Sequence, residues 1–185
     1  MPKIIKDVEE TIKRCAVELF IDYGYDQVDM KIISKKSGVA VGTLYNYYAN
    51  KKTLYTTILE ESWENTFKKL DEINELNISS KEKLQRFITT LYQDIYERKG
   101  LGKALVNNLS AALQEDETMI SLKNNLISRL ETLVTGTELL INCPNIGTRL
   151  AVTLLTSMAT LLELYPDNNE DNIDFLVQLI SLSIK

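Results

Sequence analysis

Apolar side chains recur every three to four residues along most of this chain, which is the spacing of one face of an α-helix. No stretch shows the sustained two-residue alternation that is typical of a half-buried strand. Three long stretches contain neither glycine nor proline, namely 43–99, 103–135 and 148–165, and all three carry the helical spacing. The pattern therefore predicts an all-α protein, and no internal repeat is visible.

Residues that cap free backbone groups mark the expected helix ends. Asp29 and Asn50 are suited to begin a helix, and Ser79 with Glu82 has the spacing of a capping box. Gly24 is suited to follow the last turn of the first helix. About nine helices are predicted: at 6–23 and 29–38, from near 40, from 50, from near 80, at 102–113, from 116, at 146–164 and at 170–184.

Charge is distributed unevenly along the 185 residues, whose formal net charge is −5. Residues 1–52 hold nine basic and seven acidic side chains, whereas residues 53–185 hold twelve basic and nineteen acidic ones. The acidic total argues against nucleic-acid binding by the whole surface, but it allows a small basic head on an acidic body. We therefore expect two domains with a boundary after residue 52.

The segment 29–48 has the spacing of a helix-turn-helix motif. Gly38 lies between its two short helices and permits the left-handed backbone of a tight turn. When the second helix is projected, three residues face inward: Val41, Leu44 and Tyr48. The opposite side is small or polar and carries no negative charge, as a helix in the DNA major groove requires: Gly42, Thr43, Asn46 and Tyr47.

This outward side predicts a DNA contact surface. Gly42 lets the backbone approach the DNA closely, and Tyr45 lies at the flank of the helix, where its hydroxyl reaches the sugar-phosphate backbone. Lys51 follows at the start of the next helix and suits a phosphate. The alternative is an ordinary helical bundle, in which a glycine turn and a tyrosine-rich short helix are common.

The sequence here also resembles a known family. Residues 42–48, Gly-Thr-Leu-Tyr-Asn-Tyr-Tyr, followed by Asn50-Lys51 and Leu54, are similar to the signature of the TetR family of bacterial transcriptional regulators. Upstream residues match as well: Ala16, Leu19, Phe20, Gly24-Tyr25, Ile33 and Gly38-Val39. The resemblance covers about residues 6–66. It implies a three-helix DNA-binding head on a helical ligand-binding body that forms a homodimer through its last two helices.

The resemblance implies roles for single residues. Thr43 and Tyr47 would contact the operator, whereas Tyr45 and Lys51 would contact phosphates. Lys31 stands where the family often uses a side chain that reaches DNA. The sequence departs from the family pattern at four positions: Asp29 replaces a common threonine, Ala40 a common serine, and Ser34 and Ser37 the usual small alanines.

Aromatic and flexible apolar residues cluster in the body. Ordinary core is the favoured interpretation for any one of them, but the resemblance implies an effector cavity among the middle helices. For Asp94 we favour a solvated edge over a position that serves a cationic or hydroxylated ligand. A cavity lined by these aromatic and flexible apolar residues predicts an unidentified small-molecule effector that is apolar or amphipathic. The candidate ligand-binding residues are Trp63, Phe67, Tyr92, Asp94, Tyr96, Met119 and Met158.

The last two predicted helices have more apolar surface than a solvated face needs. A pair from each subunit would form a four-helix bundle with twofold symmetry. Such a homodimer would bind a near-palindromic operator in double-stranded DNA. The candidate interface residues are Leu150, Leu154, Leu155, Met158, Leu161, Leu162, Phe175, Leu176, Leu179 and Ile180.

Several protein classes are disfavoured by composition. The chain has no histidine, which removes histidine bases and metal ligands, and its two cysteines are too few for a zinc site or a disulfide scaffold. No phosphate-binding glycine loop and no nucleophile elbow occurs, so we expect no enzyme activity, no cofactor and no metal. The charged start 1–7 is not a signal peptide, and the apolar run 150–164 is too short and too polar to span a membrane, so we expect a cytoplasmic protein.

Together these features predict a sequence-specific DNA-binding regulator, and we expect a repressor that a small molecule releases from its operator. Two alternatives stay open. One is a helical protein-interaction regulator that no longer binds DNA or responds to a ligand. The other is a small all-α enzyme, which the missing histidines and catalytic motifs disfavour.

Overall fold

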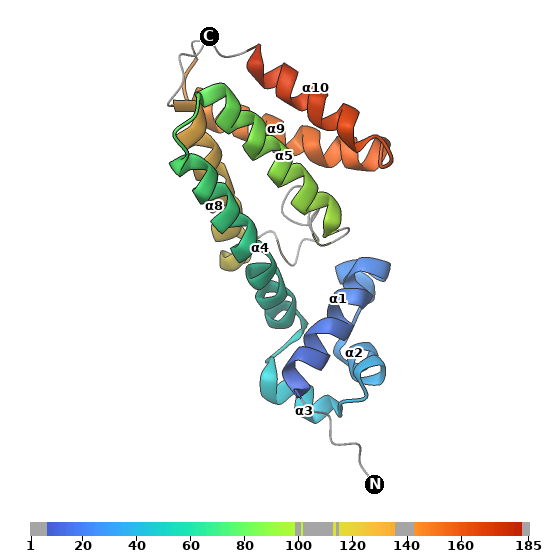
Figure 1. Cartoon of the computed structure of the whole chain (residues 1–185). Coiled ribbons are helices and arrows are strands. Elements are labelled where there is room, and N and C mark those ends of the chain that lie inside the picture. The colour runs from blue at the N-terminus through green and yellow to red at the C-terminus, as the bar shows by residue number, and fades with distance from the viewer. Residues whose placement is uncertain (1–6, 99–100, 102–112, 114, 136–142, 183–185) are drawn as a thin grey trace.

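The three N-terminal helices form a small head at one end of the molecule (Figure 1). In this computed structural model the described residues are 7–98, 101, 113, 115–135 and 143–182. The head consists of α1 (Val8–Gln27), α2 (Met30–Ser37) and α3 (Val41–Tyr47). Gly24, with a φ of 78°, interrupts the helical backbone of α1 one turn before its end, where the sequence predicted that this helix stops.

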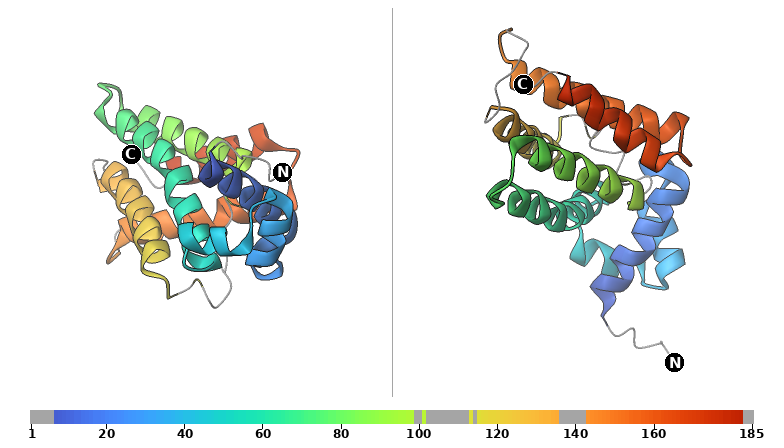
Figure 2. Two further views of the ribbon diagram at one scale, coloured as in Figure 1. Left: turned by 90° about the horizontal axis from the view of Figure 1, so that it is seen from below. Right: turned by 45° about the horizontal axis from the view of Figure 1, so that its top comes forward.

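The body is an assembly of longer helices. It contains α4 (Lys51–Glu75), α5 (Ser80–Glu97), α8 (Glu117–Thr135), α9 (Ile146–Leu164) and α10 (Asn169–Ser181). The helix α4 packs against both α5 and α8, and α10 packs against α5 and α9 (Figure 2). All elements in the described ranges are helices, which confirms the all-α fold class. The helix predicted at 102–113 lies, apart from Leu113, outside the described residues.

Side-chain caps set several helix ends where the sequence predicted them. The Asn50 side chain accepts a hydrogen bond from the Thr53 N–H at 2.9 Å, so α4 begins one residue later. Ser79 and Glu82 form the full capping box at the start of α5. By contrast, α3 has no side-chain cap, because Ala40 stands at its N-cap position. Local polar groups therefore account for these boundaries.

Head and body share one hydrophobic core. The cluster of buried side chains extends from Ile12 in α1 to Ile180 in α10 without a break. At the junction, the rings of Phe20 and Tyr55 meet edge to face with their centroids 4.9 Å apart. Since α4 runs from the head into the body, a division after residue 52 would fall in its first turn. In the described part of the chain, no helix combines the length and the apolar character needed to cross a membrane.

Candidate nucleic-acid interface

Two serines hold the turn between α2 and α3. Gly38 takes a φ of 70°, a left-handed conformation that favours glycine. The hydroxyl of Ser34 donates a hydrogen bond to the Val39 carbonyl at 2.6 Å, and the hydroxyl of Ser37 accepts one from the Val39 N–H at 3.3 Å. The polar backbone groups of the turn are thus bonded to α2, which orients α3.

The inner side of α3 anchors this helix in the head. Leu44 and Tyr48 are buried, with 0% and 4% of their surface exposed, and Val41 is half-buried. The Tyr48 hydroxyl also donates a hydrogen bond to Glu9 Oε1 at 3.1 Å, across 39 residues of sequence. The predicted inward orientation is therefore confirmed for Leu44 and Tyr48, whereas Val41 is only partly covered.

The outer side of α3 faces solvent. Its side chains are polar or small, and none of them is charged. Thr43 is half-buried, and the following four predicted residues are exposed: Gly42, Tyr45, Asn46 and Tyr47. The structure thus brings these five residues together on one short helix, whereas Lys31 is exposed on α2.

Lys51 is held against the end of α1. Its Nζ donates a hydrogen bond to the Tyr25 carbonyl at 2.7 Å and lies 4.0 Å from the centroid of the Tyr25 ring. Burial raises the pKa of Tyr25, and the nearby carboxylates of Asp26 and Asp116 raise it further, so this ring stays neutral beneath the ammonium. The hydrogen bond uses one of the three donors of the lysine. Lys51 is therefore fixed at the edge of the head beside α3.

Other basic side chains of the head are engaged by acidic ones. Lys36 pairs with Glu18 at 2.9 Å. Lys52 pairs at 3.1 Å with Asp116, whose carboxylate also caps the start of α8. The pair of Lys52 and Asp116 therefore connects the segment next to the candidate interface with the body.

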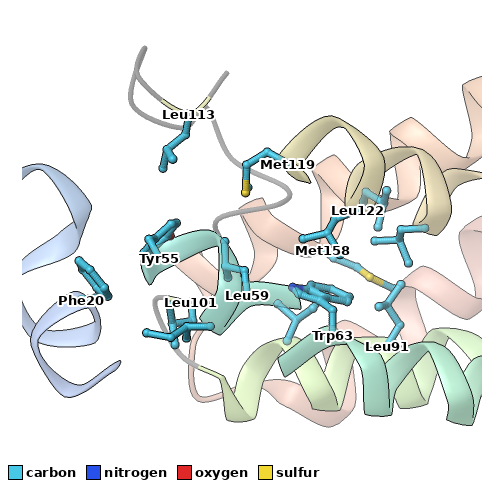
Figure 3. Close-up of a cluster of buried hydrophobic side chains, with 14 of the residues drawn as sticks. Phe20, Tyr55, Leu59, Trp63, Leu91, Leu101, Leu113, Met119, Leu122 and Met158 are labelled. Atoms are coloured by element: carbon cyan, nitrogen blue, oxygen red, sulfur yellow. The ribbon is translucent and has the colours of Figure 1, made fainter. Parts of the chain in front are cut away.

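The aromatic and methionine residues predicted for ligand binding do not all lie together. Trp63, Met119 and Met158 lie in one buried cluster of the body (Figure 3). The ring of Phe67 contacts that of Trp63, with the centroids 5.6 Å apart. Tyr96 does not join them, because 45% of its surface is exposed.

Tyr92 is buried, but its hydroxyl is already hydrogen-bonded to residues of α10. Its hydroxyl accepts a hydrogen bond from Asn172 Nδ2 at 2.8 Å. The neighbouring oxygen of Asn169 lies at 3.4 Å. This phenol therefore joins α5 to α10, a contact that the spacing of apolar residues within α5 did not predict.

Asp94 is not at a solvated edge, and that expectation was wrong. Its side chain is buried and accepts a hydrogen bond from the Thr66 hydroxyl at 2.6 Å. Lys69 bonds the other carboxylate oxygen at 2.9 Å, and Arg98 lies 3.7 Å away. These partners compensate the cost of burying the carboxylate, and two of them come from α4, which helical periodicity of α5 cannot indicate.

The relation to known proteins is strongest in the head. Residues 13–58 match the model of the family described as bacterial regulatory proteins, tetR family. The matched segment includes α2, α3 and the beginning of α4. This segment matches the TetR family.

Sequence relatives of this chain also match over part of their length. The fatty acid metabolism regulator protein of Bacillus subtilis is 32% identical over 74 residues, which are 40% of this chain and 38% of that protein. The HTH-type transcriptional regulator YuxN of Bacillus subtilis is 27% identical over 95 residues, or 51% of this chain and 33% of that protein. The chain spans less than half the length of these curated relatives.

Solved structures share the fold over nearly the whole chain. The fatty acid degradation regulator FadR from Bacillus halodurans has a TM-score of 0.77 at 18% identity and covers 96% of each chain. The FadR structure from Bacillus subtilis, which was determined in complex with stearoyl-CoA, has a TM-score of 0.70 at 19% identity. It covers 91% of this chain and 97% of that one. At these identities the likeness concerns the fold.

Three departures from the TetR pattern make hydrogen bonds in the structure. Ser34 and Ser37 replace small alanines, and both hydroxyls bond the turn before α3. Asp29 caps α2 by accepting a hydrogen bond from the Ile32 N–H at 2.8 Å. The sequence signalled the capping role of Asp29, but it did not show that the serines bond across the turn.

The prediction of the dimer interface needs correction for six residues. Leu150 and Leu161 are half-buried, and Phe175 and Leu179 are exposed. The other six lie inside the protomer, because α9 packs against α8 as well as α10, so they offer no surface to a partner: Leu154, Leu155, Met158, Leu162, Leu176 and Ile180. Apolar periodicity identified these residues as buried without indicating which helices bury them.

Proposed function

We propose that this TetR-family chain is a sequence-specific DNA-binding transcriptional regulator that acts as a repressor in the cytoplasm. A small-molecule effector would release it from its operator. The observation that carries the proposal is the outer face of α3, on which Gly42, Tyr45, Asn46 and Tyr47 are exposed. A face of this kind lets a helix approach base edges in the major groove without electrostatic repulsion.

The candidate contacts divide into two kinds. Thr43, Asn46 and Tyr47 have hydroxyl or amide groups that recognise base edges, so they would give sequence preference. Lys51, Tyr45 and Lys31 would contact phosphates and position the head, with little sequence information. Lys51 is well suited to this because Tyr25 already orders its long side chain.

The effector would bind in the helical body. Trp63, Phe67, Met119 and Met158 provide apolar and polarisable surface there, which favours an apolar or amphipathic molecule. The FadR structure from Bacillus subtilis contains stearoyl-CoA, and its chain shares the fold of this one. That likeness supports an amphipathic class of ligand.

Release from DNA would depend on α4, which begins beside α3 and continues past Trp63. A ligand shifts an equilibrium only by its difference in affinity for the two states. A hundredfold loss of operator affinity requires about 2.7 kcal/mol of coupling, and the operator must then weaken effector binding by the same factor. Mutual antagonism between DNA and effector is therefore the property to measure.

DNA binding is tested by selecting an operator from a library of random duplexes and measuring its affinity at several salt concentrations. We expect Lys51→Ala to weaken binding to operator and to random duplex alike and to flatten the salt slope by about 0.9, as the loss of one phosphate contact should. Tyr47→Ala should weaken operator binding more than binding to random duplex, by about tenfold, because a base contact contributes about 1–3 kcal/mol.

Thermal unfolding provides the control, because Lys51→Ala also removes the contact with Tyr25. The comparison is valid at temperatures where both variants remain folded. No sequence preference in the selection, or equal operator affinity of wild type and both variants, would refute the proposed DNA-binding function.

The proposed homodimer would use the outward sides of α9 and α10. Phe175, Leu179 and Leu182 form an exposed stripe along α10 at helical spacing, and Val152 is exposed on α9. Association with a second copy would remove these apolar side chains from water. A twofold dimer of this kind would match a near-palindromic operator.

We expect Phe175→Glu to raise the dimer dissociation constant at least about a hundredfold, because it places a charge in a desolvated contact. Its folding stability should change little, since 53% of Phe175 is exposed in the protomer. Sedimentation velocity measures the dissociation. Gln93→Glu, which adds the same charge at an exposed position of α5, should leave the dimer intact. Unchanged dimerisation of Phe175→Glu would place the interface elsewhere.

A further inference from the structure

Two buried N–H donors in the body have no hydrogen-bond partner within the described part of the chain. They are Trp63 Nε1 and Arg98 Nη1. Trp63 is completely buried, and only 14% of the Arg98 side chain is exposed. A buried donor without a partner costs about 1–3 kcal/mol, and more when it is charged. Unpaired buried groups of this kind are rare in native proteins and call for an acceptor.

The two side chains lie against each other. The guanidinium carbon of Arg98 is 4.5 Å from the centroid of the Trp63 ring. Its other terminal nitrogen, Nη2, donates to the Ser62 carbonyl at 2.8 Å and to the Thr66 hydroxyl. These bonds attach Arg98 to α4 and fix the plane of the guanidinium. The unpaired Nη1 is therefore held beside the indole rather than free to turn into solvent.

Arg98 shares its buried counter-charge with a second cation. Asp94 is the buried carboxylate of this cluster, and it faces two cations, Lys69 at 2.9 Å and Arg98 at 3.7 Å. Glu97 also acts on Arg98, but from an exposed position where water screens it. Burial lowers the pKa of Arg98, because surroundings of low dielectric constant disfavour its charged form. Lys69 is itself 44% exposed and partly screened by water, so Arg98 is the more deeply buried of the two cations that share the Asp94 carboxylate.

Apolar side chains surround the indole beyond the two donors. Leu59, Leu91 and Met158 lie around Trp63 in the close-up (Figure 3). Methionine side chains are flexible and polarisable, so they can repack around a guest molecule. The surroundings therefore suit an apolar chain that continues from a group bound at the donors.

We propose that Trp63 Nε1 and Arg98 Nη1 bind the acceptor head group of the effector, and that this head group is a carboxylate on an apolar chain. The proposal rests on the effector-released regulator described above and specifies the chemical class of its ligand. A carboxylate offers two acceptor oxygens for the two unpaired donors, and its negative charge suits the buried guanidinium of Arg98, which shares Asp94 with Lys69. An alcohol of the same length matches the apolar surroundings but not the charge.

The test compares decanoate with decan-1-ol as probes of the full-length chain, below the concentrations at which either aggregates. Isothermal titration calorimetry gives both dissociation constants. Trp63 is the only tryptophan, so its emission reports whether the probe reaches this place. We expect decanoate to bind at least about tenfold more tightly than decan-1-ol, because hydrogen bonds to charged groups are the stronger ones, and to change the Trp63 emission.

Two variants assign the effect to the donors. Trp63→Phe removes an N–H that has no partner in the described structure, and we expect it to lower the preference for decanoate about tenfold. The smaller ring weakens both probes alike, so the ratio of the two dissociation constants isolates the donor. Arg98→Gln should lower the ratio as well while circular dichroism shows a folded protein. Glu18→Gln, at an ion pair with Lys36 on the surface of the head, is the control and should leave the ratio unchanged.

Equal affinities of the two probes for the wild type would overturn the proposal, and so would a ratio that neither variant changes. Operator binding by the same preparations separates this failure from failure of the proposed function. A chain that binds its operator but shows no preference for decanoate is still a DNA-binding regulator, with a different effector class. A chain that binds decanoate as expected but no DNA supports the head-group assignment and contradicts the regulator.

Discussion

Gly42→Glu should reduce operator affinity at least about a hundredfold, which corresponds to about 2.7 kcal/mol. The substitution adds bulk and a negative charge to the outer face of α3, where the helix would approach the phosphates and base edges of DNA. Folding should be preserved, because Gly42 is exposed and a Cβ built there meets no described atom within 4 Å. Glutamate is also a better helix former than glycine, so the thermal stability should not fall.

Asn124→Glu is the matched control for the charge. Asn124 is exposed on α8 in the body, and the substitution changes the net charge by the same amount. Operator affinity of this control should remain within about twofold of the wild type, since exposed charges beyond about 10 Å are largely screened at moderate salt. If Gly42→Glu bound the operator as well as Asn124→Glu, then α3 would not be the recognition helix.

Asp94→Asn should destabilise the protein by about 3 kcal/mol. Asp94 is the carboxylate that faces Lys69 and Arg98 inside the body, and Arg98 would lose its counter-charge while remaining buried. Removing one partner of a buried ion pair is costly because the remaining charge is left uncompensated. The amide keeps the size of the side chain, so the change isolates the charge. Urea unfolding at neutral pH measures the difference in free energy.

An exposed ion pair supplies the comparison for this result. Arg129 pairs with Asp71 at 2.8 Å, and half of the Asp71 side chain is exposed. Asp71→Asn should therefore cost no more than about 1 kcal/mol, as is usual for surface pairs. Equal destabilisation by both substitutions would mean that the buried ion pairs of Asp94 contribute no more to the free energy of unfolding than the surface pair of Asp71.

Local sequence signals were sufficient to predict several helix boundaries and to distinguish the buried side of α3 from its exposed side. Asn50 and the Ser79–Glu82 box cap helices where the sequence predicted it. Leu44 and Tyr48 turned inward as the helical projection required. Each of these signals acts within about one turn of helix, so the necessary information lies within a few consecutive residues.

The same reasoning could not place Asp94 or the leucines of α9. Asp94 lies beside an apolar stripe, and its partners Thr66 and Lys69 stand 28 and 25 residues earlier in the chain. Periodicity predicted that Leu154 and Leu155 are buried, but it could not distinguish a partner subunit from α8 and α10 of the same protomer. A pattern of apolar residues shows which face of a helix is buried, but it does not show which element covers that face.

By itself, the sequence determined that this is an all-α protein, where several of its helices begin, and which side of α3 is free to meet another molecule. The tertiary structure alone decided that Lys51 rests on Tyr25, that Asp94 is buried between two cations, and that Leu154, Leu155 and Leu162 of α9 are buried inside the protomer. The reason is the range of the interactions. Caps and helical faces depend on neighbours within four residues, whereas pairings between helices depend on how the chain brings distant segments into contact.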